Sequence, residues 1–290
     1  MTNASLAERE DIDERPAVLL LHGLCANPLE LMPLGRVLRE AGYVVQIPAL
    51  PGYGVAAEGQ PEGRRQRVPD YREWLAMAQT HYAALAARHR RVVLGGLCMG
   101  AVLALGLAAE QPPDALLLVS TTLHFDGWNV SPWRRLLPLA YVPPLRHWLS
   151  FRETEPYGLK NERLRAWVAQ AMVSTQVSAA GAARLPAASL YQASRLLRHV
   201  RPRLGQIDVP ALVLHASEDD VAGPRSVHEL QQRLGRTPEV QWFHDSYHML
   251  TLDNERVAVA AAARDFLQRT LAAKPAASAA LFPFPEARRV

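Results

Sequence analysis

Short apolar runs recur along this 290-residue chain, and segments with the periodicity of helices separate them. Most of the runs are continuously apolar rather than alternating, which is typical of strands in a parallel sheet that is covered on both faces. The expected strands span residues 16–23, 43–50, 91–97, 114–120, 210–217 and 239–246. Because strands alternate with helices, the pattern predicts an α/β fold with a mostly parallel, doubly wound sheet.

Start and stop signals mark the helices between these strands. Asn27 followed by Pro28 is an N-cap with proline at the first helical position, and Gly42 ends that helix. Asp70 is expected to cap a second helix. The apolar face of this second helix comprises Tyr71, Trp74, Leu75, Ala78, Tyr82 and Leu85. Further helices are expected at about 99–110, 224–234 and 254–271.

The alternation stops between about Thr121 and Pro210. This stretch is rich in Trp, Pro and Arg and contains no strand-like run, so it is expected to be helical or irregular. We therefore predict a core and an inserted helical cap that can cover the strand ends. The core comprises residues 16–120 and 205–271, and the cap comprises residues 121–204. The segments 1–15 and 272–290 are expected to be flexible.

The composition is that of a globular protein in a reducing compartment. Apolar residues make up 49% of the chain and charged residues 21%. No apolar run approaches the roughly 20 residues of a transmembrane helix, and the polar opening does not resemble a signal peptide. The two cysteines cannot form a disulfide framework and are expected to be thiols. These features predict a cytoplasmic protein.

Positive charge is concentrated in the expected cap. The whole chain has a net charge of +4, but residues 131–203 contain twelve Arg and Lys against three Glu. A solvated basic face would explain this excess, and a surface for an acidic partner or an anionic substrate is the functional alternative. We expect no nucleic-acid partner.

The stretch Gly96-Leu97-Cys98-Met99-Gly100 has the form G-x-nucleophile-x-G between an expected strand and an expected helix. Such a turn strains its central residue, and its glycines let neighbouring elements approach without Cβ clashes. The side chain then projects over a helix N-terminus, where the dipole and the free N–H groups favour a thiolate. Taken alone, the pattern fits a buried structural cysteine equally well.

A thiol nucleophile needs a base, and the base needs an acid that orients it. Downstream of Cys98, one strand is followed by Asp219 and Asp220, and the next strand is followed by His244 and His248. The order nucleophile, acid, base along the chain is that of the α/β-hydrolase arrangement.

The first expected strand ends in His22-Gly23-Leu24. The backbone N–H groups of Leu24 and Met99 would together form an oxyanion hole for a tetrahedral intermediate.

With these motifs the chain resembles α/β-hydrolases of the carboxylesterase and monoacylglycerol-lipase type over nearly its whole length. The matching stretches are HGL, PALPGYG, GGLCMG, SEDDVAGP and SYHMLTLD. The resemblance implies that Asp219 is the acid and His248 the base, with a helical cap between nucleophile and acid. Three features depart from the family. Cys98 replaces serine, Tyr53 lies in PGYG where histidine is common, and little chain precedes Pro16 for the antiparallel hairpin that often opens the fold.

Several neighbouring residues have more than one interpretation. Asp220 is the alternative acid, or else a solvated or helix-capping residue. Cys25 is expected to be a packing residue, and a reversible disulfide with Cys98 is the alternative. His244 is expected to be structural or superficial, and His22 to stabilise the turn, with a proton carrier as its alternative. His215 lies late in a strand and is expected to be structural, with a place in the site lining as its alternative.

The expected cap segment 127–151 mixes aromatic residues, leucines and arginines. The candidate substrate-binding residues are Trp128 and Tyr141 from this segment, with His22 and Cys25 from the core. An apolar lining would suit an acyl chain.

The cap arginines that would bind a carboxylate, a phosphate or an acidic acyl-carrier protein are Arg134, Arg135 and Arg146. A cap packed on the core with a solvated basic face is the alternative. An interfacial lid is disfavoured, because prolines interrupt any long amphipathic helix.

Cysteine as the nucleophile predicts an acyl-thioester intermediate. We expect a hydrolase for an ester or thioester with a triad of Cys98, His248 and Asp219, and with no metal or cofactor. One alternative is an acyltransferase that passes the acyl group to an alcohol or amine, because a thioester retains transfer potential. A non-catalytic binding protein on the same fold is the third possibility.

Overall fold

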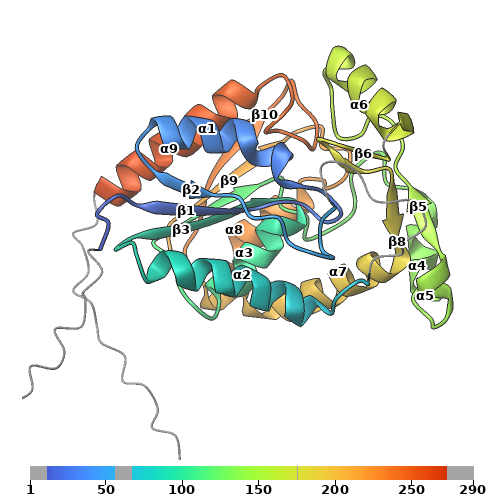
Figure 1. Ribbon diagram of the computed structural model, residues 1–290, viewed down its shortest axis with the longest axis horizontal. Coiled ribbons are helices and arrows are strands. Elements are labelled where there is room, and N and C mark those ends of the chain that lie inside the picture. Colours follow the sequence, from blue (N-terminus) through green and yellow to red (C-terminus); the bar gives the residue numbers. More distant parts are fainter. Residues whose placement is uncertain (1–11, 56–66, 175, 273–290) are drawn as a thin grey trace, which may run out of the picture.

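A computed structural model describes residues 12–55, 67–174 and 176–272 (Figure 1). Six parallel strands form the central sheet in the order β10-β9-β4-β3-β1-β2. The strands are β1 (Ala17–Leu21), β2 (Val44–Gln46), β3 (Val92–Leu97), β4 (Ala115–Val119), β9 (Ala211–Ala216) and β10 (Glu239–Phe243). Each lies within one of the six predicted runs, so the parallel α/β fold is confirmed.

Helices cover both faces of this sheet (Figure 1). One face carries α1 (Met32–Glu40) and α9 (Arg256–Ala272), and the other carries α2 (Tyr71–Ala86), α3 (Met99–Ala108) and α8 (Arg225–Arg233). Successive strand residues point to opposite faces, so Leu19 packs in the α2–α3 core and Leu20 in the α1–α9 core. Burial on both sides explains why the strands read as unbroken apolar runs.

The predicted helix starts are present in the structure. The Asn27 side chain accepts a hydrogen bond from the Leu29 N–H, and a 3-10 turn, η1 (Pro28–Leu31), leads into α1. Asp70 caps α2 in a capping box with Glu73.

The order of the strands reverses at β1. From β1 the chain moves to β2 on one side, and then returns to place β3 on the other side of β1. Loops that leave β1 and β3 therefore diverge at the carboxyl edge of the sheet, which is where open α/β sheets bind ligands.

The insertion between β4 and β9 forms a cap beyond this edge of the sheet (Figure 1). Its helical segments are η2 (Pro132–Leu136), α4 (Leu137–Ala140), α5 (Leu145–Trp148), α6 (Glu162–Ser174), α7 (Ala187–Val200) and η3 (Arg201–Gln206). The expectation of no strands here was wrong. Two small antiparallel sheets pair β5 (Ser150–Arg152) with β8 (Arg184–Pro186), and β6 (Val177–Ser178) with β7 (Gly181–Ala182). Strands of two or three residues are too short to show a period of two, so only pairing within the cap defines them.

The last helix of the predicted cap packs with the core. Ala193, Leu196 and Val200 of α7 are fully buried in the same cluster as α2 and α3. Most of the two segments predicted to be flexible lies outside the described residues. Asp13, within the first of them, forms a parallel bridge with His89. Within the described ranges, no helix is both long and apolar enough to cross a lipid bilayer.

Candidate active site

Cys98 lies at the sharp turn between β3 and α3. Its backbone has φ +57° and ψ −119°, a conformation that is strained for a residue with a side chain. Its N–H donates to the Val119 carbonyl at 3.0 Å, which ties the turn to β4. A Cβ at Gly96 would collide with the Gly100 backbone, and one at Gly100 would collide with the Leu21 carbonyl. The turn can therefore be this tight only with glycine on both sides of the cysteine.

His248 and Asp219 form a buried pair next to this turn. The His248 Nδ1 lies 2.9 and 2.8 Å from the two carboxylate oxygens of Asp219. Asp219 is held by the N–H groups of Val221 and Ala222, which both donate to its Oδ1 at 2.8 Å. The carboxylate is thus fixed by the loop that follows β9 and points at the imidazole.

Asp220 faces the backbone rather than the imidazole ring. It accepts hydrogen bonds from the His248 N–H at 3.3 Å and from the N–H of the cap residue Gly158 at 3.2 Å. The Gly158 carbonyl in turn accepts from the Met249 N–H at 2.8 Å. Asp220 therefore joins the cap to the histidine loop, a role that no sequence motif indicates.

Asp219 and His248 each favour the charged form of the other. Burial opposes ionisation of both partners, but the Asp219 carboxylate and the Cys98 sulfur raise the pKa of His248 well above its ordinary value. Burial likewise opposes ionisation of Asp219, but the facing His248 lowers the pKa of that carboxyl. The other ring nitrogen, Nε2, is buried and makes no well-formed hydrogen bond to a described residue. It is the atom that can exchange a proton with a reacting group.

Polar residues after β4 complete the surroundings of Cys98. The Thr122 hydroxyl lies 3.2 Å from the Cys98 Sγ and 3.2 Å from the Ser120 carbonyl oxygen. The Ser120 hydroxyl donates to the His248 carbonyl at 2.7 Å. Sequence reasoning missed both residues. The signal was the polar Ser120-Thr121-Thr122 run, which ends the strand adjacent to the elbow strand.

The loop after β1 lies against this turn. A methyl group at Gly23 would be 3.6 Å from the Cβ of Cys98. The N–H groups of Leu24 and of Met99, the first residue of α3, have no hydrogen-bond partner among the described residues. The two predicted oxyanion donors therefore come from adjoining loops on either side of Cys98.

A buried glutamate supports the β1 loop. Glu30 is 1% exposed, and its Oε1 accepts the Gly23 N–H at 2.5 Å. Its backbone carbonyl accepts a 2.5 Å bond from Thr251, which lies just beyond His248. Burial raises the pKa of Glu30 to about 8, against the opposing effects of the Gly23 N–H and His248. This carboxyl could not be recognised from the sequence, because Glu30 looks there like an ordinary residue of an amphipathic helix.

The candidate substrate residues His22 and Cys25 lie in the same loop. His22 is fully buried, with Nδ1 2.9 Å from the Gly23 carbonyl and Nε2 accepting the Leu50 N–H at 3.3 Å. Burial lowers the pKa of His22 to about 4, so it is a neutral turn-stabilising residue. Cys25 lines a cavity, but both it and Cys98 are free thiols. The structure therefore contains no disulfide between them.

The two cap candidates lie farther away. Trp128 is 58% exposed and packs edge-on against Tyr247 at a centroid separation of 5.4 Å, and its Nε1 donates to the Glu218 carbonyl. Tyr141 packs at 5.5 Å against Tyr191, which lines the cavity. Neither candidate is itself part of the cavity wall.

The remaining histidines have structural partners, as expected. His215 is buried, donates from Nε2 to the Ala222 carbonyl at 2.8 Å, and lies 3.7 Å from Asp219. Burial lowers the pKa of His215, so it adds little positive charge beside the Asp219 carboxylate. His244 is exposed, and its Nδ1 lies 2.9 Å from the Ser217 hydroxyl.

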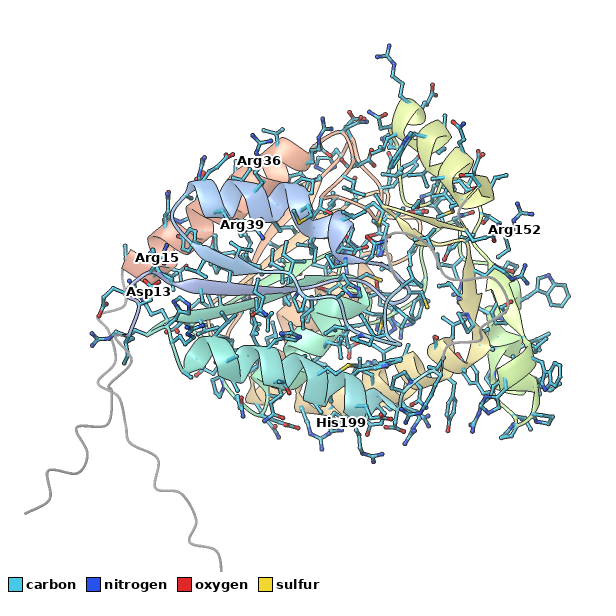
Figure 2. All side chains as sticks on the ribbon, in the orientation of Figure 1. Asp13, Arg15, Arg36, Arg39, Arg152 and His199 are labelled. Atoms are coloured by element: carbon cyan, nitrogen blue, oxygen red, sulfur yellow. The ribbon has the colours of Figure 1, made fainter. Side chains whose placement is uncertain are left out.

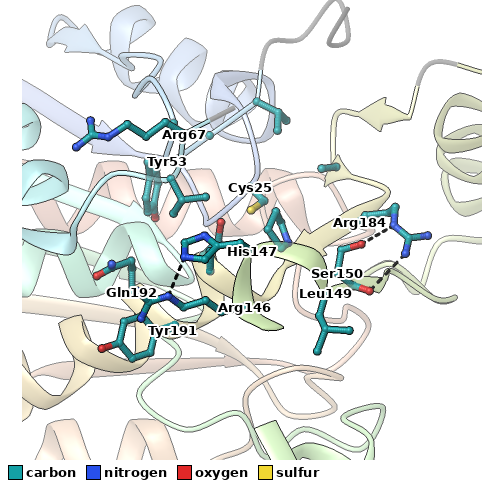
Figure 3. A pocket seen from close by; sticks show the side chains of 18 of the residues that line it. Cys25, Tyr53, Arg67, Arg146, His147, Leu149, Ser150, Arg184, Tyr191 and Gln192 are labelled. Carbon is teal, nitrogen blue, oxygen red and sulfur yellow. Dashed lines mark hydrogen bonds between the residues drawn. The ribbon is translucent and has the colours of Figure 1, made fainter. Parts of the chain in front are cut away.

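A cavity of about 790 Å³ separates the β1 loop from the cap (Figure 3). Cys25 and Tyr53 form its core side, and Arg146, His147 and Leu149 belong to the cap side. The cavity is a neighbouring space that meets the site at Cys25, one residue beyond Leu24, and Cys98 does not line it. In the ranges that the structure describes, no cluster of three His, Cys, Asp or Glu is placed to hold a metal ion.

A parallel sheet with a nucleophile elbow, a facing His–Asp pair and an inserted cap defines an α/β-hydrolase. The family described as "Serine aminopeptidase, S33" matches residues 13–255, so the chain belongs to this family and is an enzyme of the α/β-hydrolase class. The family description names serine, whereas the elbow of this chain carries Cys98.

Relatives of similar length support this assignment. The chain is 26% identical to a thermostable monoacylglycerol lipase of Bacillus sp. (strain H-257), over 87% of this chain and 90% of the relative. It is also 26% identical to a carboxylesterase of Bacillus subtilis (strain 168), over 87% and 92% of the two chains.

Solved structures share the fold. One of the metagenome-derived lipolytic enzymes LipS and LipT has a TM-score of 0.71 at 21% identity, with 89% of this chain and 96% of that chain covered. A monoacylglycerol lipase of Paleococcus ferrophilus has a TM-score of 0.70 at 18% identity, with 90% and 96% covered.

Proposed function

We propose that this enzyme hydrolyses carboxylic esters or thioesters through an acyl-Cys98 intermediate. The observation that carries the proposal is the convergence of a partly exposed Cys98 with the buried His248–Asp219 pair and the two N–H groups of Leu24 and Met99. The names of the two Bacillus relatives, a monoacylglycerol lipase and a carboxylesterase, support an ester as substrate.

In the first half-reaction the Cys98 thiolate attacks the acyl carbonyl carbon. The carbonyl oxygen becomes an oxyanion that the Leu24 and Met99 N–H groups bind, and loss of one such donor typically costs about 10²–10³ in rate. The His248 imidazolium gives its Nε2 proton to the departing alcohol or thiol as the bond to carbon breaks. The acyl group then remains on Sγ as a thioester, and His248 is neutral.

In the second half-reaction neutral His248 takes a proton from water, and the resulting hydroxide attacks the thioester. A second oxyanion forms in the same hole and collapses to release the carboxylic acid and the Cys98 thiolate. His248 is again an imidazolium, so protons and charge balance over the cycle. Asp219 keeps the ring oriented and stabilises its charged form throughout.

The proposal is tested by incubating the enzyme with a p-nitrophenyl ester and measuring the intact mass. We expect one acyl adduct per chain, located on Cys98 by peptide mapping and abolished in Cys98→Ala. Cys25→Ala is the matched control and should acylate like the wild type. An adduct on another residue in Cys98→Ala would refute the assignment.

Cys98→Ser separates a general triad from one adapted to a thiol. Retained hydrolysis would show that the pair can deprotonate an alcohol, and an inactive but folded variant would show that the histidine environment requires a thiolate.

Acyl transfer is the second candidate, and the thioester intermediate favours it because a thioester keeps its acyl-transfer potential. An excess of an alcohol or amine acceptor would then divert product from free acid to conjugate. A constant yield of free acid would exclude transfer to the acceptors used.

A protein that never acylates, but whose melting temperature is raised by ligands, would instead match the non-catalytic alternative. The acyl-carrier partner and the cytoplasmic location stay predictions.

A further inference from the structure

The outer segment of the cap, residues 132–151, exposes an unusual amount of apolar surface. We call this segment the cap edge. Among the described residues, eight of the fifteen exposed large apolar side chains lie within it. They are Trp133, Leu136, Leu139, Val142, Leu145, Trp148, Leu149 and Phe151. Trp133 is 74% exposed and Trp148 is 70% exposed, so these indoles are not packed in a core. Clusters of exposed apolar residues of this size mark interaction sites.

From the sequence, this part of the cap was expected to offer an apolar lining for an acyl chain, or else to pack on the core with a solvated basic face, and an interfacial lid was disfavoured. The structure shows a different arrangement, because the chain forms short turns, η2, α4 and α5, at the end of the molecule away from the start of β1 (Figure 1). The prolines that exclude a long amphipathic helix instead break the segment into these turns, and the turns display their apolar side chains outward.

Charge within residues 131–152 has only one sign, and the next acidic residues are Glu153 and Glu155. Residues 131–152 contain four arginines and no Asp or Glu. The arginines are Arg134, Arg135, Arg146 and Arg152, and Figure 2 labels Arg152 where it projects from this end of the molecule. None of them forms an ion pair with a described carboxylate. Arg146 lines the cavity and stacks on the Tyr191 ring at 4.8 Å, so the exposed arginines are the other three. Some surface arginines elsewhere are paired, as Arg36 is with Glu40 and Arg269 with Glu239, so the cap edge differs in having no acidic residue among its arginines.

We propose that the cap edge docks on the surface of an anionic lipid bilayer. Tryptophan and leucine suit the boundary between head groups and acyl chains, and unpaired arginines suit the negative surface of the bilayer. A second copy of this chain is a poorer partner, because a two-fold contact would place these arginines against each other. The proposal concerns binding alone and does not depend on acyl chemistry at Cys98.

Docking on this surface would have a direct consequence for the site. Trp148 and Leu149 of the cap edge also line the cavity beside the β1 loop. With a bilayer bound at the cap edge, Trp148 and Leu149 would lie between the lipid and this cavity. The cavity meets the candidate site at Cys25, next to Leu24.

Co-sedimentation of the full-length protein with vesicles tests the proposal. We expect binding to phosphatidylcholine vesicles that contain 30% phosphatidylglycerol, and at least tenfold weaker binding to pure phosphatidylcholine. Raising the NaCl concentration to 0.5 M should also weaken binding, because salt screens the arginines. The Cys98→Ala variant should bind like the wild type, so failure of the proposed hydrolysis would not affect this result.

Two matched double variants locate the surface. Trp133→Ser with Leu139→Ser removes two side chains that are 74% and 64% exposed on the cap edge. Trp167→Ser with Val173→Ser removes two that are 54% and 72% exposed on α6, outside the cap edge. The first pair should lower vesicle affinity at least tenfold, and the second should leave it within twofold. Unchanged melting temperatures would show that both variants fold.

Three results would overturn the proposal. The first is wild-type binding that is absent or independent of phosphatidylglycerol, and the second is an equal loss of affinity in both double variants. The third is a concentration-dependent dimer, seen by analytical ultracentrifugation, that only the Trp133→Ser and Leu139→Ser variant abolishes. That outcome would identify the cap edge as an interface between copies of this chain.

Discussion

Two neighbouring loops each present a cysteine at the carboxyl edge of the sheet, and only one cysteine has reactive surroundings. Cys25 follows β1 with φ +56°, and Cys98 follows β3 with φ +57°. Both strands are parallel and adjacent. Residue type, sheet edge and positive φ are shared, whereas Cys98 directly follows β3 and Cys25 lies beyond a short loop after β1. The groups that face each sulfur differ as well.

Those groups differ in polarity and charge. Cys25 is 5% exposed, and burial raises the pKa of its thiol to about 12, although Ser189 hydrogen-bonds to it. Cys98 is partly exposed, with the Thr122 hydroxyl at 3.2 Å and His248 close enough for the sulfur to raise the pKa of the imidazole. The comparison teaches that backbone conformation alone does not mark a nucleophile, and that the proposed role of Cys98 depends on the imidazole and the hydroxyl donor that face it.

The strongest challenge to the comparison is to remove each thiol in turn. Cys98→Ala should reduce ester turnover by about 10⁴-fold or more, because the covalent route is lost. Cys25→Ala should stay within about threefold, since it removes only a packing thiol. Steady-state hydrolysis of a p-nitrophenyl ester measures both. Comparable losses in the two variants would contradict the distinction between the loops.

The two adjacent aspartates extend the test to the base. Asp219→Asn should lower kcat by about 10²–10³-fold, because an amide cannot both accept the Val221 and Ala222 N–H groups and orient the charged imidazole. Asp220→Asn should lower kcat by about tenfold or less, since Asp220 touches only backbone N–H groups. Its main effect should be a lower melting temperature. The reverse order of the two kcat values would make Asp220 the orienting acid.

Alkylation compares the two sulfurs without any mutation. In the native protein, iodoacetamide should modify Cys98 at least about 10²-fold faster than Cys25, because only Cys98 combines exposure with a facing cation. In 6 M guanidinium chloride the two rates should converge. Time-resolved peptide mapping gives both rate constants, and a native ratio near one would be inconsistent with the proposed environments.

The smallest expected effect concerns the carboxyl that supports the β1 loop. Because the folded-state pKa of Glu30, about 8, lies above its ordinary value of 4.5, the folded protein binds more protons between these limits. Glu30 therefore contributes stability that is complete below pH 4.5 and is lost as the pH rises toward 8. Urea unfolding at pH 5 and pH 8 should show a loss on the order of 2 kcal/mol in the wild type.

Glu30→Gln should shrink that loss, because glutamine can accept the Gly23 N–H at both pH values without ionising. Other titrating groups are common to both proteins, so the difference between the two losses isolates Glu30. Identical pH dependence in the two proteins would show that the carboxyl does not titrate in this range.

Much of the core could be predicted because its signals are local. Six mostly apolar runs predicted six parallel strands, of which β1, β3, β4 and β9 are buried throughout, and the Asn27 and Asp70 caps predicted where two helices begin. The elbow was visible because collisions with neighbouring backbone require glycine at both 96 and 100. Each of these features is encoded within a few consecutive residues.

The parts that could not be predicted depend on contacts between distant segments. The short strands of the cap exist only through pairs such as Phe151 with Leu185. Thr122 and Glu30 acquire their roles from Cys98 and Gly23, which lie on other elements. The outward orientation of Trp133 was equally invisible, since an exposed and a buried tryptophan look alike in sequence.

The glycines of the elbow also determine which changes the site tolerates over evolutionary time. A side chain at 96 or 100 would strike backbone atoms, so those two positions accept no substitution without moving a strand. Position 98 is different, because its side chain points away from these contacts and a serine differs from cysteine there by one atom. Position 98 is therefore the part of the motif that can be exchanged without moving the backbone. Under the proposed function, a single substitution there tests whether the same scaffold supports oxygen as well as sulfur chemistry.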